Sequence, residues 1–195
     1  MSLVTHRLAN FLQMKNHFFI FGRPRSRTAW LANFLTYGET FCSHEGMADC
    51  SGSLIELERR MAELPARIVG NADTGLIHIA QDVISHFPKA KLIVLTENEF
   101  SWRMFCTKNN INQELIKRVD DDYRRTKELL KDRALFVPIN LLTAPAPSGL
   151  VDVWLHLGLQ LKDFPLERFN VLRDLNVQIM PESLQRRVGI PTGSW

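Results

Sequence analysis

Short runs of apolar residues alternate with longer amphipathic stretches along the chain. The runs lack the apolar–polar alternation of a half-exposed strand, so they predict buried β-strands. They lie at residues 18–21, 67–70, 91–96 and 134–137. The amphipathic stretches predict helices at residues 28–37, 54–64, 76–87, 100–107, 114–131, 148–157 and 165–175, with a short helix before the first strand. Short buried strands, each followed by a helix, predict an α/β fold of three layers, with a central, mostly parallel sheet between two layers of helices.

Ligands of such sheets bind beyond the carboxyl ends of the strands. The segments that follow the first three predicted strands are residues 22–28, 71–75 and 96–103. We therefore expect these three segments to converge on one site.

The size and composition of the chain fit one globular domain. It has 195 residues, of which 45% are hydrophobic and 23% charged, so we expect a single domain over residues 1–195. No apolar run approaches the roughly 20 residues of a membrane span, and the first residues lack the pattern of a signal peptide. Three cysteines without a CxxC pair are typical of reduced thiols, so we expect a cytoplasmic protein. The formal net charge of +3 mildly favours anionic ligands but is too small to indicate nucleic-acid binding.

A cationic turn follows the first predicted strand. The strand ends at Gly22, and Arg23, Arg25 and Arg27 then alternate with Pro24 and Ser26 before a predicted helix begins. Such a turn brings backbone N–H groups, the positive end of a helix dipole and guanidinium groups to one point, so it predicts a phosphate or sulfate site. The alternative is that the arginines only solvate a loop.

The spacing of this turn argues against an ordinary P-loop nucleotide triphosphatase. The Walker A motif requires a second glycine followed by lysine and then serine or threonine. Counted from Gly22, these positions hold Arg27, Thr28 and Ala29.

The turn resembles a different phosphate-binding loop. Its residues Pro24, Arg25, Ser26, Thr28, Trp30 and Leu31 are similar to the 5′-phosphosulfate loop of PAPS-dependent sulfotransferases, roughly Pro-[Lys/Arg]-Ser-Gly-Thr-Thr-Trp-Leu after the first strand. The resemblance implies a P-loop NTPase-like fold, PAPS as donor, PAP as product and no metal. It implies that Arg25 binds the bridging and sulfuryl oxygens, and that Ser26 and Thr28 bind the 5′-phosphate. The donor-binding residues would be Arg23, Pro24, Arg25, Ser26, Arg27, Thr28, Ala29 and Trp30.

Two residues of the loop depart from the family pattern. Arg27 stands where the family has glycine, and a positive φ there would cost about 1 kcal/mol or more. Ala29 stands where the family has a second phosphate-binding threonine, so one side-chain hydrogen bond is absent.

The resemblance also implies a catalytic base. In several branches of the family a glutamate shortly after this helix removes the proton of the acceptor, and Glu45 lies at a similar distance from the loop. An acceptor hydroxyl needs such a group because it is a poor nucleophile while protonated. His44 is the competing base, and a polar loop pair or helix cap is the third interpretation.

The expected site for the 3′-phosphate of the donor matches less well. Family members usually carry an arginine after the strand at residues 91–96 and a serine about two helical turns later. Thr96 occupies the arginine position, and Ser101 and Arg103 are the candidate substitutes.

Three other polar features have structural interpretations. Asp73 either orients an acceptor or pairs with Arg25 or Arg27, or it caps the next helix. His78 is interpreted as a packed or surface histidine. Residues 120–122 are three consecutive aspartates that cannot face one ion from a helix, so they are interpreted as a solvated face.

Together these residues predict a small sulfotransferase-like enzyme. It would transfer a sulfuryl group from a PAPS-type donor to a hydroxyl or amine acceptor, with Arg25 on the donor and Glu45 or His44 on the acceptor. The alternatives are a divergent nucleotide kinase or phosphotransferase and a non-catalytic nucleotide-binding module. The sequence leaves the acceptor and the oligomeric state open.

Overall fold

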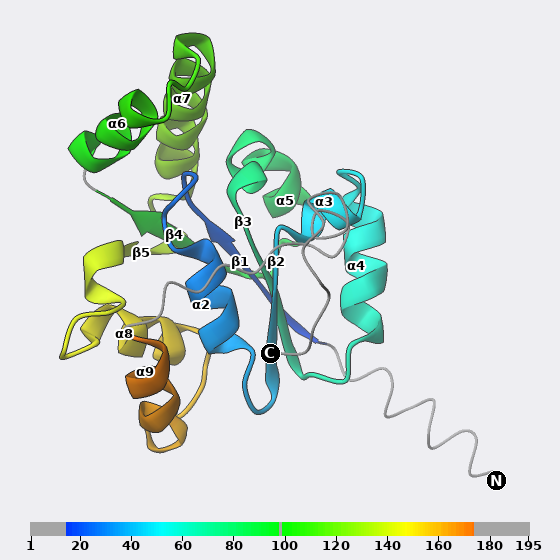
Figure 1. Cartoon of the computed structure of the whole chain (residues 1–195). Helices are drawn as coiled ribbons and strands as arrows, with labels where there is room; N and C mark the ends of the chain where they lie inside the picture. The colour runs from blue at the N-terminus through cyan, green and yellow to red at the C-terminus, as the bar shows by residue number, and fades with distance from the viewer. Residues whose placement is uncertain (1–14, 98, 174–195) are drawn as a thin grey trace, which may run out of the picture.

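The computed structural model describes residues 15–97 and 99–173, which contain a five-stranded parallel sheet (Figure 1). The strands are β1 (Asn16–Phe21), β2 (Thr40–His44), β3 (Ile68–Asp73), β4 (Lys91–Thr96) and β5 (Ala134–Pro138). Their order in the sheet is β2-β3-β1-β4-β5, and every neighbouring pair is parallel. The prediction of an α/β fold around a parallel sheet is confirmed.

Strand β1 lies at the centre of the sheet, and its side chains are apolar on both faces. Residues 18–21 are completely buried, and β1 pairs with β3 on one side and β4 on the other. Phe18 lies opposite Gly70, where a Cβ atom would come within 2.3 Å of the phenyl ring. A glycine on β3 therefore makes room for a phenylalanine of the central strand.

The polar end of the sheet differs from the prediction. Strand β2 was not predicted, because its sequence Thr-Phe-Cys-Ser-His contains few apolar residues; it is an edge strand that pairs only with β3. Residues 71–73 belong to β3 and not to a loop as predicted. Asn71 and Asp73 are buried there because their side chains accept hydrogen bonds from backbone amides of the neighbouring helix.

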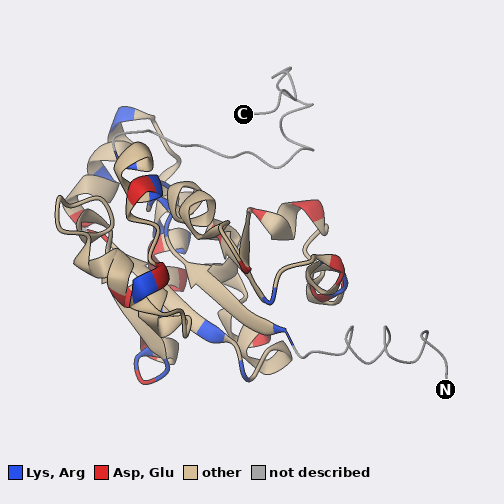
Figure 2. Ribbon diagram, turned by 90° about the horizontal axis from the view of Figure 1, so that it is seen from below, with Lys and Arg blue, Asp and Glu red and all other residues tan. Residues whose placement is uncertain are grey.

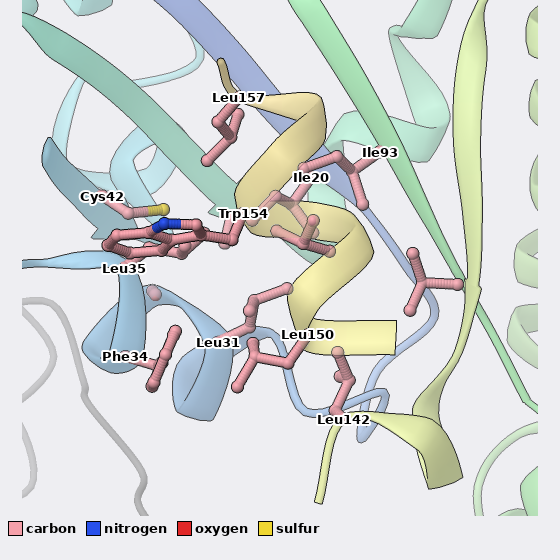
Figure 3. Close-up of a cluster of buried hydrophobic side chains, with 14 of the residues drawn as sticks. Ile20, Leu31, Phe34, Leu35, Cys42, Ile93, Leu142, Leu150, Trp154 and Leu157 are labelled. Carbon is pink, nitrogen blue, oxygen red and sulfur yellow. The ribbon is translucent and has the colours of Figure 1, made fainter. Parts of the chain in front are cut away.

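Helices cover both faces of the sheet (Figure 1). One face carries α2 (Thr28–Leu35), α8 (Ser148–His156) and α9 (Leu166–Leu172), which share a hydrophobic cluster with the sheet. Figure 3 shows the part of this cluster between α2, α8 and the sheet. A second cluster joins the other face to α3 (Gly46–Asp49), α4 (Leu54–Glu63), α5 (Ala80–His86), α6 (Glu99–Lys108) and α7 (Gln113–Leu130). The central strand contributes Phe18 and Ile20 to the first cluster and Phe19 and Phe21 to the second.

Several helix boundaries differ from the prediction. The predicted helix 76–87 is a 3-10 helix, η1 (Thr74–His78), followed by α5. Helix α2 ends at Leu35, two residues early, because the chain turns at residues 37–40 to enter β2. Two further 3-10 turns, η2 (Ile139–Leu141) and η3 (Leu161–Asp163), precede α8 and α9. The predicted N-terminal helix and the end of the predicted helix 165–175 lie outside the described residues.

Charged residues lie mostly on the helices and loops, and the strands are largely uncharged (Figure 2). Among the described residues, no helix is both long and apolar enough to cross a membrane.

Candidate active site

The loop between β1 and α2, residues 22–27, turns sharply at the carboxyl end of the central strand. A hydrogen bond of 3.1 Å from the Ser26 N–H to the Arg23 carbonyl closes a β-turn around Pro24 and Arg25. Arg25 has φ of 74°, which with proline before it is the pattern of a type II turn. The turn packs so tightly that a Cβ atom at Gly22 would lie 2.1 Å from Ser26 Oγ.

The same loop leaves hydrogen-bonding groups unmatched. Arg27, in the position of the family glycine, has φ of 63° and precedes α2 without capping it by a side-chain hydrogen bond. Ser26 is completely buried, and its Oγ has no hydrogen-bond partner. Buried hydroxyls and the first amides of a helix normally have partners. An anion at this point would supply acceptors for both.

Two of the three arginines of the loop are exposed. The Arg25 guanidinium lies over the ring of Phe105 on α6, with Cζ 5.4 Å from the ring centroid, and Arg27 is also open to solvent. Both remain available to bind an anion at the loop.

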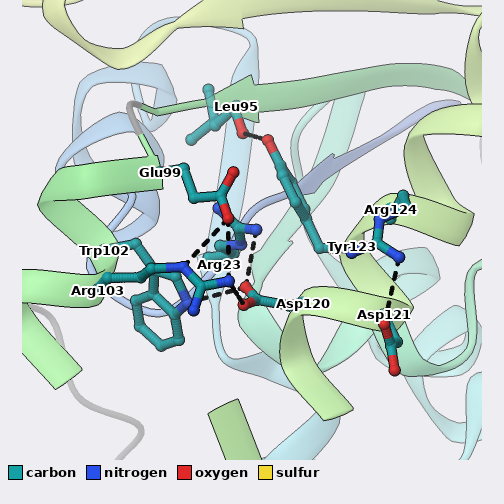
Figure 4. Close-up of polar contacts among 9 residues, drawn as sticks. All are labelled: Arg23, Leu95, Glu99, Trp102, Arg103, Asp120, Asp121, Tyr123 and Arg124. Atoms are coloured by element: carbon teal, nitrogen blue, oxygen red, sulfur yellow. Dashed lines mark hydrogen bonds and ion pairs between the residues drawn. The ribbon is translucent and has the colours of Figure 1, made fainter. Parts of the chain in front are cut away.

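Arg23 has a different environment (Figure 4). Its guanidinium forms a 2.8 Å ion pair with Asp120 of α7, and both side chains are 8% exposed. It also lies over the ring of Tyr123, 4.4 Å from the centroid. The Tyr123 hydroxyl in turn donates to the carbonyl of Leu95 on β4. Arg23 therefore fastens the loop to α7 through a buried ion pair and a cation–π contact.

The interpretation of residues 120–122 as a solvated face is wrong for two of the three aspartates. Asp120 and Asp122 are buried, while Asp121 is only partly buried, with its side chain 42% exposed, and pairs with Arg124. Asp122 contacts His78 and Arg125. The three carboxylates do point to different partners, as the 100° between consecutive helical residues requires.

Glu45 lies directly after β2 and reaches the end of β3. Its carboxylate accepts hydrogen bonds from the Thr74 hydroxyl at 2.9 Å and the Thr74 amide at 3.3 Å. His44 Nε2 lies 3.6 Å from Glu45 Oε1 and 3.2 Å from the hydroxyl of Thr28, the first residue of α2. The two predicted candidate bases are thus connected to the anion loop by one chain of polar contacts.

The surroundings of Glu45 change its acidity. Burial, together with the negative charge of Asp73, raises the pKa of Glu45 to about 7, although hydrogen bonds from Thr74 oppose the shift. A carboxylate with such a pKa is suited to accept a proton at neutral pH.

Buried polar residues of β3 hold Glu45 in place. Asn71 Oδ1 accepts from the Gly46 amide, and the Asp73 carboxylate accepts from the amides of Met47 and Gly75. Both bonds to α3 fix the residues next to Glu45, whose own φ is 56°. The described contacts of Asp73 match the capping interpretation, with bonds to the starts of α3 and η1.

The end of β4 carries acidic groups. Glu97 follows Thr96, and its Oε1 is buried without a hydrogen-bond partner. Burial raises the pKa of Glu97 to about 7; Arg23 lowers it and Asp120 raises it further. Ser101 is exposed on α6, and Arg103 pairs with Glu99 at 3.0 Å and with Asp120 at 3.4 Å.

A cavity of about 230 Å³ lies beside the loop. Pro24, Thr74 and Gly75 line it, together with mostly apolar side chains of α6 and α7 such as Trp102, Phe105 and Ile116. It places an apolar space next to both the anion loop and the hydrogen-bond partner of Glu45.

Comparison with solved structures shows that this arrangement of strands and helices is known. The fold is sulfotransferase-like. The structure is similar to that of mouse sulfotransferase SULT7A1, crystallised with PAP, with a TM-score of 0.58 and 14% sequence identity. The match covers 82% of this chain and 64% of that one, so the chain spans less than two thirds of the enzyme it matches. No family model and no curated protein matches the sequence.

The sequence placed Asn71, Thr74 and Glu97 in segments expected at the site but assigned them no contact with the base or the loop, and it interpreted Asp120 as part of a solvated face. Thr74 and Asn71 lie in a segment predicted to be a loop, and Glu97 follows a strand without belonging to any motif. Asp120 is far from Arg23 in the sequence, and only its place on the inner face of amphipathic α7 could have indicated burial.

Replacing Asp120 tests whether the buried ion pair fixes the loop. We expect Asp120→Asn to lower the free energy of unfolding by about 3–5 kcal/mol, because Arg23 would remain buried without its counter-charge. The same change at the adjacent Asp121, whose side chain is 42% exposed, is expected to alter the free energy of unfolding by less than about 0.5 kcal/mol. Chemical denaturation of the two variants measures both, and equal effects would contradict a special role for Asp120.

Proposed function

We propose that the chain is a sulfotransferase-like enzyme that transfers a sulfuryl group from a PAPS-type donor to a hydroxyl or amine acceptor. The observation that carries the proposal is the β1–α2 loop, where a buried Ser26 hydroxyl without a partner, an uncapped helix start and two exposed arginines gather. The similarity of the fold to a sulfotransferase crystallised with PAP supports it.

The residues of the loop fit the 5′-phosphosulfate of the donor. Arg25 and the amides of Arg23 and of residues 25–28 would bind the phosphate and sulfuryl oxygens, with Ser26 and Thr28 as hydroxyl donors. Charge that develops on these oxygens during transfer would be stabilised by preorganised donors. The residues at the end of β4 do not offer the same fit to a 3′-phosphate, since Arg103 already pairs with two carboxylates.

Glu45 is the proposed base. In the transfer step the acceptor oxygen forms a bond to sulfur, and the bond between sulfur and the bridging oxygen of the donor breaks. The bridging oxygen leaves with the electron pair as part of the nucleotide phosphate. The acceptor proton passes to Glu45, whose pKa of about 7 lets it accept that proton at neutral pH. The apolar cavity next to Thr74 is the proposed position of the acceptor.

Binding of a nucleotide 5′-phosphate tests the donor loop. Calorimetric titration with adenosine 5′-phosphate and with PAP is expected to show binding of at least one of them. Arg25→Gly should weaken that binding by about 10- to 100-fold through loss of a charged hydrogen bond, and glycine tolerates the positive φ of this position. The control Arg124→Ala removes an exposed arginine of α7 and should leave affinity unchanged. If neither nucleotide binds at millimolar concentration, the proposal is wrong.

The pH dependence of transfer tests the base. With a panel of phenols and amines as acceptors, kcat/KM should rise with an apparent pKa near 7, because Glu45 must lose its proton to act. Glu45→Gln should lower kcat by about 10²- to 10⁴-fold and remove the rise of kcat/KM with pH. The control Glu63→Gln, on the exposed side of α4, should leave kcat and the pH dependence unchanged. If His44→Gln removes the rise and Glu45→Gln does not, His44 is the base.

A protein that binds nucleotide but shows no turnover with any acceptor, in the wild type as in the variants, would instead be a non-catalytic binding module.

A further inference from the structure

Carboxylates lie at the carboxyl ends of three strands near the anion loop. Glu45 comes directly after β2, Asp73 ends β3, and Glu97 lies one residue past the end of β4. β3 and β4 are the two strands paired with β1, so both neighbours of the loop present an acidic group at their carboxyl ends. The cationic loop therefore lies between negative charges on both sides.

The two arginines beside the loop already form ion pairs, although Arg23 Nε is buried without a hydrogen-bond partner. Arg23 pairs with Asp120 at 2.8 Å, and Arg103 pairs with Glu99 and Asp120. Toward β4 these two arginines face three carboxylates: Glu97, Glu99 and Asp120. The exposed cations Arg25 and Arg27 both lie within the loop itself.

A further negative charge nearby would be unfavourable for Glu97 in particular. Its Oε1 is buried without a hydrogen-bond partner, and the nearby Arg23 is held by Asp120. A phosphate bound beside an ionised Glu97 would meet a like charge in a partly buried, low-dielectric setting.

The spacing of the strands indicates which groups a second phosphate of the nucleotide could meet. Neighbouring strands lie about 4.8 Å apart, a distance comparable with the width of one ribose. When the 5′-phosphate of a nucleotide occupies the loop after β1, the neighbouring strand ends are those of β3 and β4, and a second phosphate that turns from the ribose toward the sheet would meet the groups there. Asp73 ends the one strand and Glu97 follows the other.

We infer that the site takes a nucleoside 5′-phosphosulfate that carries no second phosphate on its ribose, and that Glu97 is a determinant of this specificity. The inference rests on the proposed function, because it requires the 5′-anion to bind at the loop. The corresponding products are adenosine 5′-phosphate, which lacks the second phosphate, and PAP, which carries it at the 3′ position.

Competing titrations of these two products test the inference. At about pH 8, above the pKa of Glu97, the wild-type protein is expected to bind adenosine 5′-phosphate about tenfold or more tightly than PAP. Glu97→Gln keeps the shape of the side chain and removes its charge. It should therefore reduce the ratio of the two affinities, mainly by tightening the binding of PAP. Glu167→Gln removes the same charge from the exposed face of α9 and should leave the ratio unchanged.

The outcomes separate this inference from the proposed function. If the wild-type protein binds PAP as tightly as adenosine 5′-phosphate or more tightly, the inference is wrong, while the proposal that an anion binds at the loop is still supported. This comparison needs no variant, so it holds even if Glu97→Gln fails to fold. A preference for adenosine 5′-phosphate that Glu97→Gln leaves unchanged overturns the role of Glu97. If neither nucleotide binds, the proposed function fails and the inference fails with it.

Discussion

The buried ion pair between Arg23 and Asp120 holds the anion loop in its place. Arg23 belongs to the loop after the central strand, and Asp120 to α7, which is also joined to β4 by the hydrogen bond from Tyr123 to Leu95. Two charges with 8% exposed side chains are stable only together, since either one alone would be desolvated without compensation. The pair therefore determines which arginines remain for a ligand: Arg23 is held by Asp120, while Arg25 and Arg27 are exposed.

Backbone strain is concentrated around the same loop. Among the described residues, five non-glycine residues have positive φ, and Arg25, Arg27 and Glu45 are three of them. Each such conformation costs roughly 1–3 kcal/mol and persists only where the surrounding structure enforces it. Here the Ser26–Arg23 turn, the start of α2 and the bonds from Asn71 and Asp73 to α3 enforce it. Strain of this kind is typical of functional sites. Here it lies at the loop proposed to bind the sulfuryl donor and at Glu45, the base proposed for the acceptor.

The sequence predicted those parts of the fold in which local pattern and burial agree. β1 and β4 each contain an uninterrupted apolar run, and α4 begins at the residue where the amphipathic pattern predicts a helix. β2 escaped prediction because an edge strand with polar residues has no such pattern. The anion loop was predictable because its residues are consecutive. The parallel-sheet rule places Thr74 and Glu97 in segments that meet at the site, and the amphipathic pattern of α7 is the one local signal of burial at Asp120. The contacts that these residues make depend on how distant segments pack, so no local pattern reveals them.

The central claim is that an anion occupies the loop between β1 and α2 without disturbing the ion pair beneath it. A crystal structure of the protein with adenosine 5′-phosphate tests this claim most directly. We expect the phosphate to lie at the start of α2, within hydrogen-bond distance of Ser26 Oγ and of the amides of residues 25–28, with Arg23 still paired to Asp120. A phosphate bound elsewhere, or a loop that binds it only after Arg23 has left Asp120, would contradict the account.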